Sequence, residues 1–133
     1  MALGIARAAV DDAWQYSQER IQFGKPICHN QSVRHMLAEA KTKLEACRLM
    51  TYQGAWLADQ DVIATVEMSM SKLFVTETAL EIVLTCQRIL GAYGYVRDFA
   101  MERYVRDMLA MPILGGSSAI QKNNIANRLN LPK

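Results

Sequence analysis

The chain has 133 residues, the length of one domain, and its 51% hydrophobic and 21% charged residues exclude an intrinsically disordered protein. The formal net charge is only +2 and is spread along the chain, so we expect neither nucleic acid nor an anionic membrane surface as a partner. No stretch offers about 18 uncharged apolar residues, which predicts that the chain has no membrane span.

The cysteines and histidines give no sign of a disulfide framework or a metal site. Cys28, Cys47 and Cys86 are odd in number, far apart and set among apolar residues, which is typical of reduced, mostly buried thiols. His29 and His35 have no carboxylate nearby at metal-ligand spacing, so we expect no bound metal. This pattern predicts a cytoplasmic protein, or one of the mitochondrial matrix if its source is eukaryotic.

Apolar residues recur at steps of three and four positions, which predicts helices over most of the chain. The first expected helix covers residues 3–23. The Phe-Gly-Lys-Pro run at residues 23–26 ends it, because glycine permits a positive φ and proline disfavours a helical residue before it. The second expected helix covers residues 33–58, with Asn30 as its N-cap.

The third expected helix covers residues 62–90, with Asp61 as its N-cap, and is apolar around most of its circumference. Such a helix is usually covered by neighbours on several sides. Gly91 follows it at the position where a left-handed residue commonly ends a helix. A fourth helix is expected over residues 99–111, before Pro112.

The last expected helix covers residues 118–129 and opens with the capping-box pattern of Ser118 and Gln121. No segment alternates apolar and polar residues for long enough to indicate a strand. The sequence therefore predicts an all-α fold, an up-down four-helix bundle with a short extra C-terminal helix, in one domain over residues 1–133.

Two further expectations concern the ends and the large side chains of this bundle. The amphipathic pattern is already under way at Met1, without a capping residue, so we expect the domain to be a fragment of a longer chain. Trp14 and Trp56 are expected to pack between helices.

Three segments at helix ends carry the residue types that bind ligands: residues 19–26 with Gln31, residues 87–95, and residues 112–121. Taken one at a time, each is most simply a turn or a cap. An arginine beside Phe-Gly, however, can bind a phosphate while the ring packs on a planar base. Gly-Gly-Ser-Ser at a helix start offers N–H groups and hydroxyls to an anion or a polar ring.

The order of these motifs resembles the C-terminal helical domain of the acyl-CoA dehydrogenases: R-x-x-F-G-K-P-I, a later Gln, Q-x-I-L-G-x-x-G-Y, R-D and G-[ST]-S-x-I-Q. The resemblance covers essentially the whole chain. It implies a FAD-dependent enzyme that oxidises an acyl-CoA thioester to 2,3-enoyl-CoA and passes electrons to an electron-transfer flavoprotein. It also implies a homodimer or homotetramer in which this domain contributes FAD contacts and subunit assembly.

The same resemblance assigns cofactor contacts to positions of this chain. The R-x-x-F-G loop and the later Gln would bind the FAD of a neighbouring subunit around its pyrophosphate and adenine, and the segment after the third helix would contact that FAD too. The hydroxyl of G-[ST]-S would contact the flavin of its own subunit. The residues implied are Arg20, Phe23, Gln31, Arg88, Gly91 and Ser117.

The chain departs from the family pattern at the catalytic base. Many members carry a Glu where this chain has Gly115, and glycine cannot abstract a proton, so no catalytic residue is expected within the chain. Members without that Glu place it upstream in the first helix, which would be roughly two turns before Met1. Two alternatives stay open: a reductase-like member of the family, and a free-standing helical module that oligomerises or binds without catalysis. The isolated domain is expected to be inactive.

Overall fold

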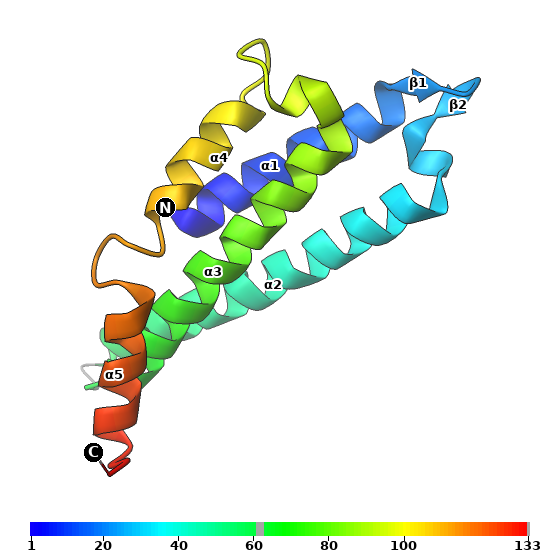
Figure 1. Cartoon of the computed structure of the whole chain (residues 1–133). Coiled ribbons are helices and arrows are strands. Elements are labelled where there is room, and N and C mark those ends of the chain that lie inside the picture. The colour runs from blue at the N-terminus through cyan, green and yellow to red at the C-terminus, as the bar shows by residue number, and fades with distance from the viewer. Residues whose placement is uncertain (61–62, 133) are drawn as a thin grey trace.

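The computed structural model describes residues 1–60 and 63–132, and within them it confirms the all-α class (Figure 1). Five α-helices are joined by short connections that include one small hairpin. The elements in chain order are α1 (Ala2–Glu19), β1 (Ile21–Gln22), β2 (Lys25–Pro26), the 3-10 turn η1 (Ile27–His29), α2 (Gln31–Asp59), α3 (Thr65–Leu90), the 3-10 turn η2 (Gly91–Gly94), α4 (Met101–Ala110) and α5 (Ser118–Arg128).

Helix α3 is the centre of the bundle, because it packs against α1, α2, α4 and α5. Figure 1 shows α1, α2 and α3 running lengthwise, with the β1–β2 hairpin at one end and α5 at the other. Helix α4 also contacts α1, which closes the four-helix bundle and leaves α5 as an additional helix on α3. The predicted cover of the third helix on several sides is thus confirmed.

The core contains small residues on α1 and larger ones on α3. Ala6, Ala9 and Ala13 of α1 are fully buried, and alanine at this spacing lets a neighbouring helix approach closely. Ile82 and Val83 of α3 belong to the same buried cluster and are at most 1% exposed. Full burial of such a side chain contributes about 1.5–3 kcal/mol to stability.

The first helix ends earlier than the sequence predicted, at Glu19 instead of residue 23. The chain then forms an antiparallel hairpin in which Ile21 pairs with Pro26. Phe23 and Gly24 at its tip both have positive φ, 54° and 78°, as a type I′ turn requires. Strands of two residues are too short to produce an alternating pattern, which is why the expectation of no strand was wrong.

The helix caps also differ from the predictions. Asn30 occupies the N-cap position of α2, but its side chain makes no capping hydrogen bond. Helix α5 is capped by Ser117, whose hydroxyl accepts from the Ile120 N–H at 3.5 Å, and not by Ser118. Helix α4 begins at Met101, two residues after the predicted start. The predicted cap Asp61 lies outside the described residues.

The two tryptophans differ from the expectation to different degrees. Trp56 is 60% exposed and lies largely on the outside of the bundle, so it does not pack between helices as expected. Trp14 is 47% exposed, because it lies in an open groove between α1 and α2. Among the described helices none is both long and apolar enough to cross a membrane.

Two of the three free cysteines, Cys47 and Cys86, are fully buried, and Cys28 is half-buried. Burial raises the pKa of Cys47 to about 11 and that of Cys86 to about 12, from an ordinary value of 9.0. The folded chain therefore keeps both thiols protonated at a pH where the unfolded chain ionises them.

This difference predicts a loss of stability at alkaline pH. Because the folded pKa values lie above the unfolded value, the free energy of unfolding should fall as pH rises from about 9 to about 11. Urea unfolding at about pH 8 and about pH 10.5 measures the change. A variant with both Cys47→Ala and Cys86→Ala should lose less stability over this interval. An equal loss of stability in the variant would show that the two thiols do not cause the pH dependence.

Candidate functional site

The β1–β2 hairpin places Phe23 at an exposed tip. Its side chain is 94% exposed, and its φ of 54° is unusual for a residue with a bulky side chain. Non-glycine residues held at a positive φ cluster at ligand-binding and switch segments. Gln31, the first residue of α2, is also exposed and follows the hairpin through η1.

Arg20 links the hairpin to the far end of α3. Its guanidinium carbon lies 5.2 Å from the ring centroid of Tyr93 in η2, a cation–π distance. Tyr93 in turn contacts Tyr16 and Phe99, with ring centroids 6.2 and 5.4 Å away. This aromatic cluster holds the arginine half-buried at the end of the bundle.

The end of α3 is shaped by two glycines of the Q-x-I-L-G-x-x-G-Y motif. Gly91 ends the helix with a φ of 61°, close to the exposed side chain of Arg88. Gly94 is buried, and a Cβ there would lie 2.7 Å from the Gln87 carbonyl oxygen. The Gln87 side chain also donates to the Gly94 carbonyl at 3.4 Å. Gln87 therefore holds the turn after α3, and Tyr93 holds Arg20 beside it. Sequence reasoning assigned neither residue a role.

The Gly-Gly-Ser segment lies at the opposite end of the bundle, before α5 (Figure 1). Gly115 and Gly116 both have positive φ, 65° and 89°. The buried side chain of Gln121 donates from Nε2 to both of their carbonyl oxygens, at 3.3 and 3.2 Å. Ser117 is half-buried at the N-cap of α5.

Two charged side chains of α3 bind the same segment. Lys72 donates from Nζ to the Pro112 carbonyl at 3.1 Å, and the Ser118 hydroxyl donates to the Glu77 carboxylate. Lys72 and Glu77 lie about 40 positions before their partners Pro112 and Ser118 in the chain, so no local sequence signal pointed to them.

Gly115 lines an open cleft beside the start of α1. The cleft, of about 400 Å³, is also lined by Met1, Leu3, Lys72 and Leu114, among other residues of α2 and α3. The residue at the family's usual base position thus faces the point at which the described chain begins.

The predicted cofactor residues do not gather in one site. Arg20, Phe23, Gln31, Arg88 and Gly91 lie at or near the hairpin end, while Ser117 lies at the end where α1 starts. Helix α1 has 18 residues, so the two ends are about 27 Å apart at 1.5 Å per residue. One small ligand group cannot contact both ends.

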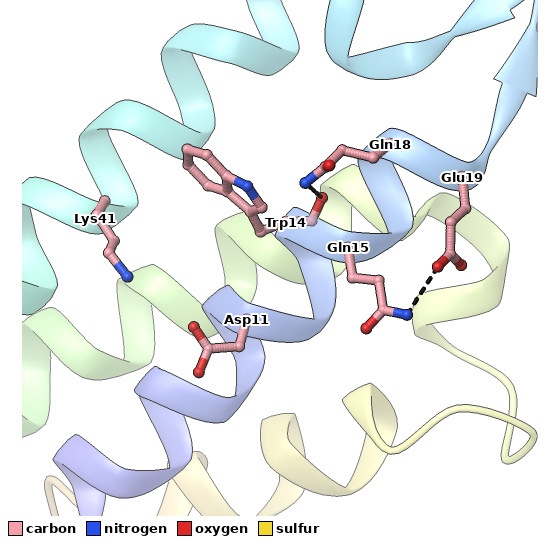
Figure 2. Close-up of a pocket in the computed structure, with 6 residues that line it drawn as sticks. All are labelled: Asp11, Trp14, Gln15, Gln18, Glu19 and Lys41. Atoms are coloured by element: carbon pink, nitrogen blue, oxygen red, sulfur yellow. Dashed lines mark hydrogen bonds between the residues drawn. The ribbon is translucent and has the colours of Figure 1, made fainter.

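A second hollow, between α1 and α2, contains none of the predicted site residues. Figure 2 shows Trp14 facing α2 there, with Lys41 on the other side of the groove and Asp11 below it. Its polar groups bond locally along α1, such as Gln15 Nε2 to Glu19 Oε1 at 2.7 Å. Across residues 1–60 and 63–132, no group of three or more His, Cys, Asp or Glu is placed to bind a metal ion.

The geometry of the glycine pair gives a stability prediction. A Cβ on residue 116 would lie 2.7 Å from Gln121 Nε2 at a φ of 89°, so Gly116→Ala should lower the free energy of unfolding by about 1–3 kcal/mol. The control is Gly4→Ala in α1, where a Cβ meets nothing within 4 Å and should stabilise by about 0.5–1 kcal/mol. Urea unfolding of both variants tests this. Equal stability of the two would be inconsistent with the described geometry.

Comparison with known proteins shows the family of the chain. The family profile described as "Acyl-CoA dehydrogenase, C-terminal domain" matches residues 1–130. The chain is 42% identical over 128 residues to 3-(aryl)acrylate reductase of Clostridium sporogenes, an alignment that covers 96% of this chain and 34% of that protein.

Two solved structures have closely similar folds. Butyryl-CoA dehydrogenase from Megasphaera elsdenii superposes with a TM-score of 0.94 at 34% identity, over 96% of this chain and 33% of that one. The FAD complex of PigA superposes with a TM-score of 0.92 at 32% identity, over 98% and 34%. The chain spans about a third of the length of the curated relatives that it matches. The profile, the motif order and the fold agree, and the chain belongs to the acyl-CoA dehydrogenase family as its C-terminal domain.

Proposed function

We propose that this chain is the C-terminal domain, and so a fragment, of a FAD-dependent acyl-CoA dehydrogenase. The complete enzyme would oxidise an acyl-CoA thioester to 2,3-enoyl-CoA, and this domain would contribute FAD contacts and subunit assembly. The observation that carries the proposal is the placement of the predicted cofactor residues at two opposite ends of a domain of this family. Two ends suit a domain that contacts the FAD of a neighbouring subunit at one end and its own flavin at the other.

The residues at the hairpin end fit a dinucleotide. Arg20 and Arg88 carry guanidinium groups, which bind phosphate oxygens in a bidentate geometry. The exposed ring of Phe23 suits packing on a planar base, and the carboxamide of Gln31 suits its hydrogen-bonding edge. Gly91 leaves space for close approach, because a Cβ there meets nothing within 4 Å. When bound, FAD would accept the hydride that leaves the β-carbon of the substrate.

The proton from the α-carbon needs a base that this chain does not supply at Gly115. We place that base upstream, in a segment that precedes Met1. The cleft supports this placement, because Met1, Ala2 and Leu3 line it together with Gly115. A carboxylate on an upstream continuation of α1 would reach the region of Gly115, and Ser117 at the N-cap of α5 would present its hydroxyl to the flavin of the same subunit.

A second candidate is a reductase-like member of the family that works in the opposite direction. The 42% identity to a 3-(aryl)acrylate reductase favours it, together with the missing Glu at position 115. Either direction needs a group that exchanges the α-proton. A non-catalytic oligomerisation or binding module would need none, and would bind no FAD even in the presence of the rest of its chain.

The proposal extends to partners and location. We infer an acyl-CoA substrate, an electron-transfer flavoprotein as redox partner, and a homodimer or homotetramer. Leu49, Tyr52 and Trp56 support the oligomer, because they form a stripe along α2 that is 57–60% exposed. The free thiols of all three cysteines suit the cytoplasm or the mitochondrial matrix.

The FAD contact predicts a binding defect in Arg20→Ala. A charge-assisted contact to pyrophosphate is worth roughly 1.5–3 kcal/mol, so the full-length variant should bind FAD about ten-fold more weakly or worse. The ratio of flavin to protein absorbance after dialysis measures this, and circular dichroism checks that the helices remain. Arg7→Ala, which removes an exposed arginine of α1, should retain FAD like the parent. Unchanged flavin retention in Arg20→Ala would reject the role.

The upstream base predicts an exchange defect with a specific rescue. Removal of the upstream carboxylate should slow deuterium exchange at the acyl α-carbon by about 10²–10⁴-fold. Adding Gly115→Glu should restore part of the exchange, because a Cβ at that position meets nothing within 4 Å. The φ of 65° makes the substitution cost about 1–2 kcal/mol, so full recovery is not expected.

Gly116→Glu in the same background serves as the control, since its side chain would collide with Gln121. Exchange at the parent rate without the upstream carboxylate would place the base elsewhere.

A further inference from the structure

The buried side chain of Gln121 connects the first turn of α5 to the glycine pair. We propose that Gln121 is a positioning residue, whose carboxamide holds the Gly115–Gly116 backbone in one orientation beside the reacting end of the substrate. The proposal rests on the proposed function, because that function places the acyl-CoA and the flavin at this end. None of the cofactor contacts implied by the family motifs includes this residue.

The hydrogen bonds of Gln121 explain how it would act. The side chain is 8% exposed, and Nε2 has two N–H groups for two carbonyl oxygens, at 3.3 Å from Gly115 and 3.2 Å from Gly116. The described chain has no cis peptide, so the C=O and N–H of each peptide unit point in opposite directions. With both carbonyls turned toward Gln121, the N–H groups of Gly116 and Ser117 are directed away from it.

The glycines and the glutamine require one another. A Cβ at position 116 would lie 2.7 Å from Gln121 Nε2, so any other residue there would push the carboxamide away from its two carbonyls. Both glycines also need positive φ, which other residues rarely adopt. A shorter or apolar side chain at position 121 would leave two carbonyls of this strained pair without their donor.

The rest of the segment is held by other groups. Lys72 binds the Pro112 carbonyl at its start, and Glu77 accepts from the Ser118 hydroxyl at its end. These two are the charged side chains of α3 that bind the segment. Gln121 bonds to the middle of the segment, where Gly115 lines the cleft with Met1. Loss of Gln121 should therefore displace the middle of the segment while its ends stay in place.

The test is Gln121→Glu, a substitution of nearly the same shape. An ionised carboxylate offers no donor and would repel both carbonyls, whereas the protonated form offers one O–H donor. Burial and two carbonyl neighbours favour the protonated form, so the introduced carboxyl should titrate above its usual range. As the pH falls from about 9 to about 6, the variant should thus regain one of the two hydrogen bonds.

In the full-length enzyme we expect kcat of Gln121→Glu to be about 10²-fold below the parent at high pH and to recover toward low pH, relative to the parent at each pH. KM for the acyl-CoA should stay within about two-fold. Gln121→Leu should be slow at every pH. The control Asn123→Asp introduces a carboxylate at an exposed position of the same helix and should follow the parent. A flat ratio to the parent across pH for Gln121→Glu would overturn the proposal.

Backbone NMR relaxation on the 133-residue chain separates this proposal from the proposed function. The order parameters of the amides of residues 115–117 should fall in Gln121→Leu from the range of a rigid backbone, about 0.85, to below about 0.6, with α1 and α3 unchanged. Unchanged order parameters would overturn the positioning role, whatever the activity. Failure of the full-length parent to bind FAD would instead overturn the proposed function, and the order parameters would still decide whether Gln121 holds the segment.

Discussion

The packing of α3 against every other helix is the constraint on which the structure depends. Most of its circumference is apolar, so α1, α2, α4 and α5 pack against it and remove that surface from water, while a stripe that includes Met70, Glu77 and Arg88 stays exposed. The small buried residues of α1 allow α1 and α3 to approach closely. With these neighbours in place, α3 runs from one end of the bundle to the other (Figure 1).

Helix α3 then organises two different parts of the candidate site. From its first half, Lys72 and Glu77 bind the segment that leads into α5. After its last turn, Tyr93 of η2 holds Arg20 by a cation–π contact. One central helix thus sets the distance between a surface suited to phosphates and planar rings and a surface suited to a thioester and a flavin. In an oligomeric enzyme this distance lets one domain serve two cofactor molecules, as proposed above.

Close approach to a glycine backbone is a feature that the two ends share. Gly94 lies against the Gln87 carbonyl, and Gly116 lies against the Gln121 carboxamide, so that neither position has space for a Cβ. In both cases a glutamine side chain donates to the glycine carbonyl. The pairing of glycine with glutamine orders turns that would otherwise have many conformations, because glycine loses more backbone freedom on folding than any other residue.

The sequence by itself determined the helices, the all-α class and the family. Helical periodicity is local, since side chains three and four positions apart share a face, and the motifs keep their order along the chain. The sequence also placed Arg20, Phe23 and the Gly-Gly-Ser run at helix ends. It could not show the hairpin, whose strands have two residues each, nor that Ser117 and not Ser118 caps α5.

Only the tertiary structure decided which distant groups meet. The contacts of Arg20 with Tyr93 and of Lys72 with Pro112 join positions 73 and 40 residues apart, and no local pattern encodes such a separation. The exposure of Trp14 and Trp56 likewise depends on which helix faces are left uncovered, which hydrophobicity alone does not specify. Local sequence patterns therefore identified the candidate binding residues, and the packing of the other helices around α3 decided where each of them lies.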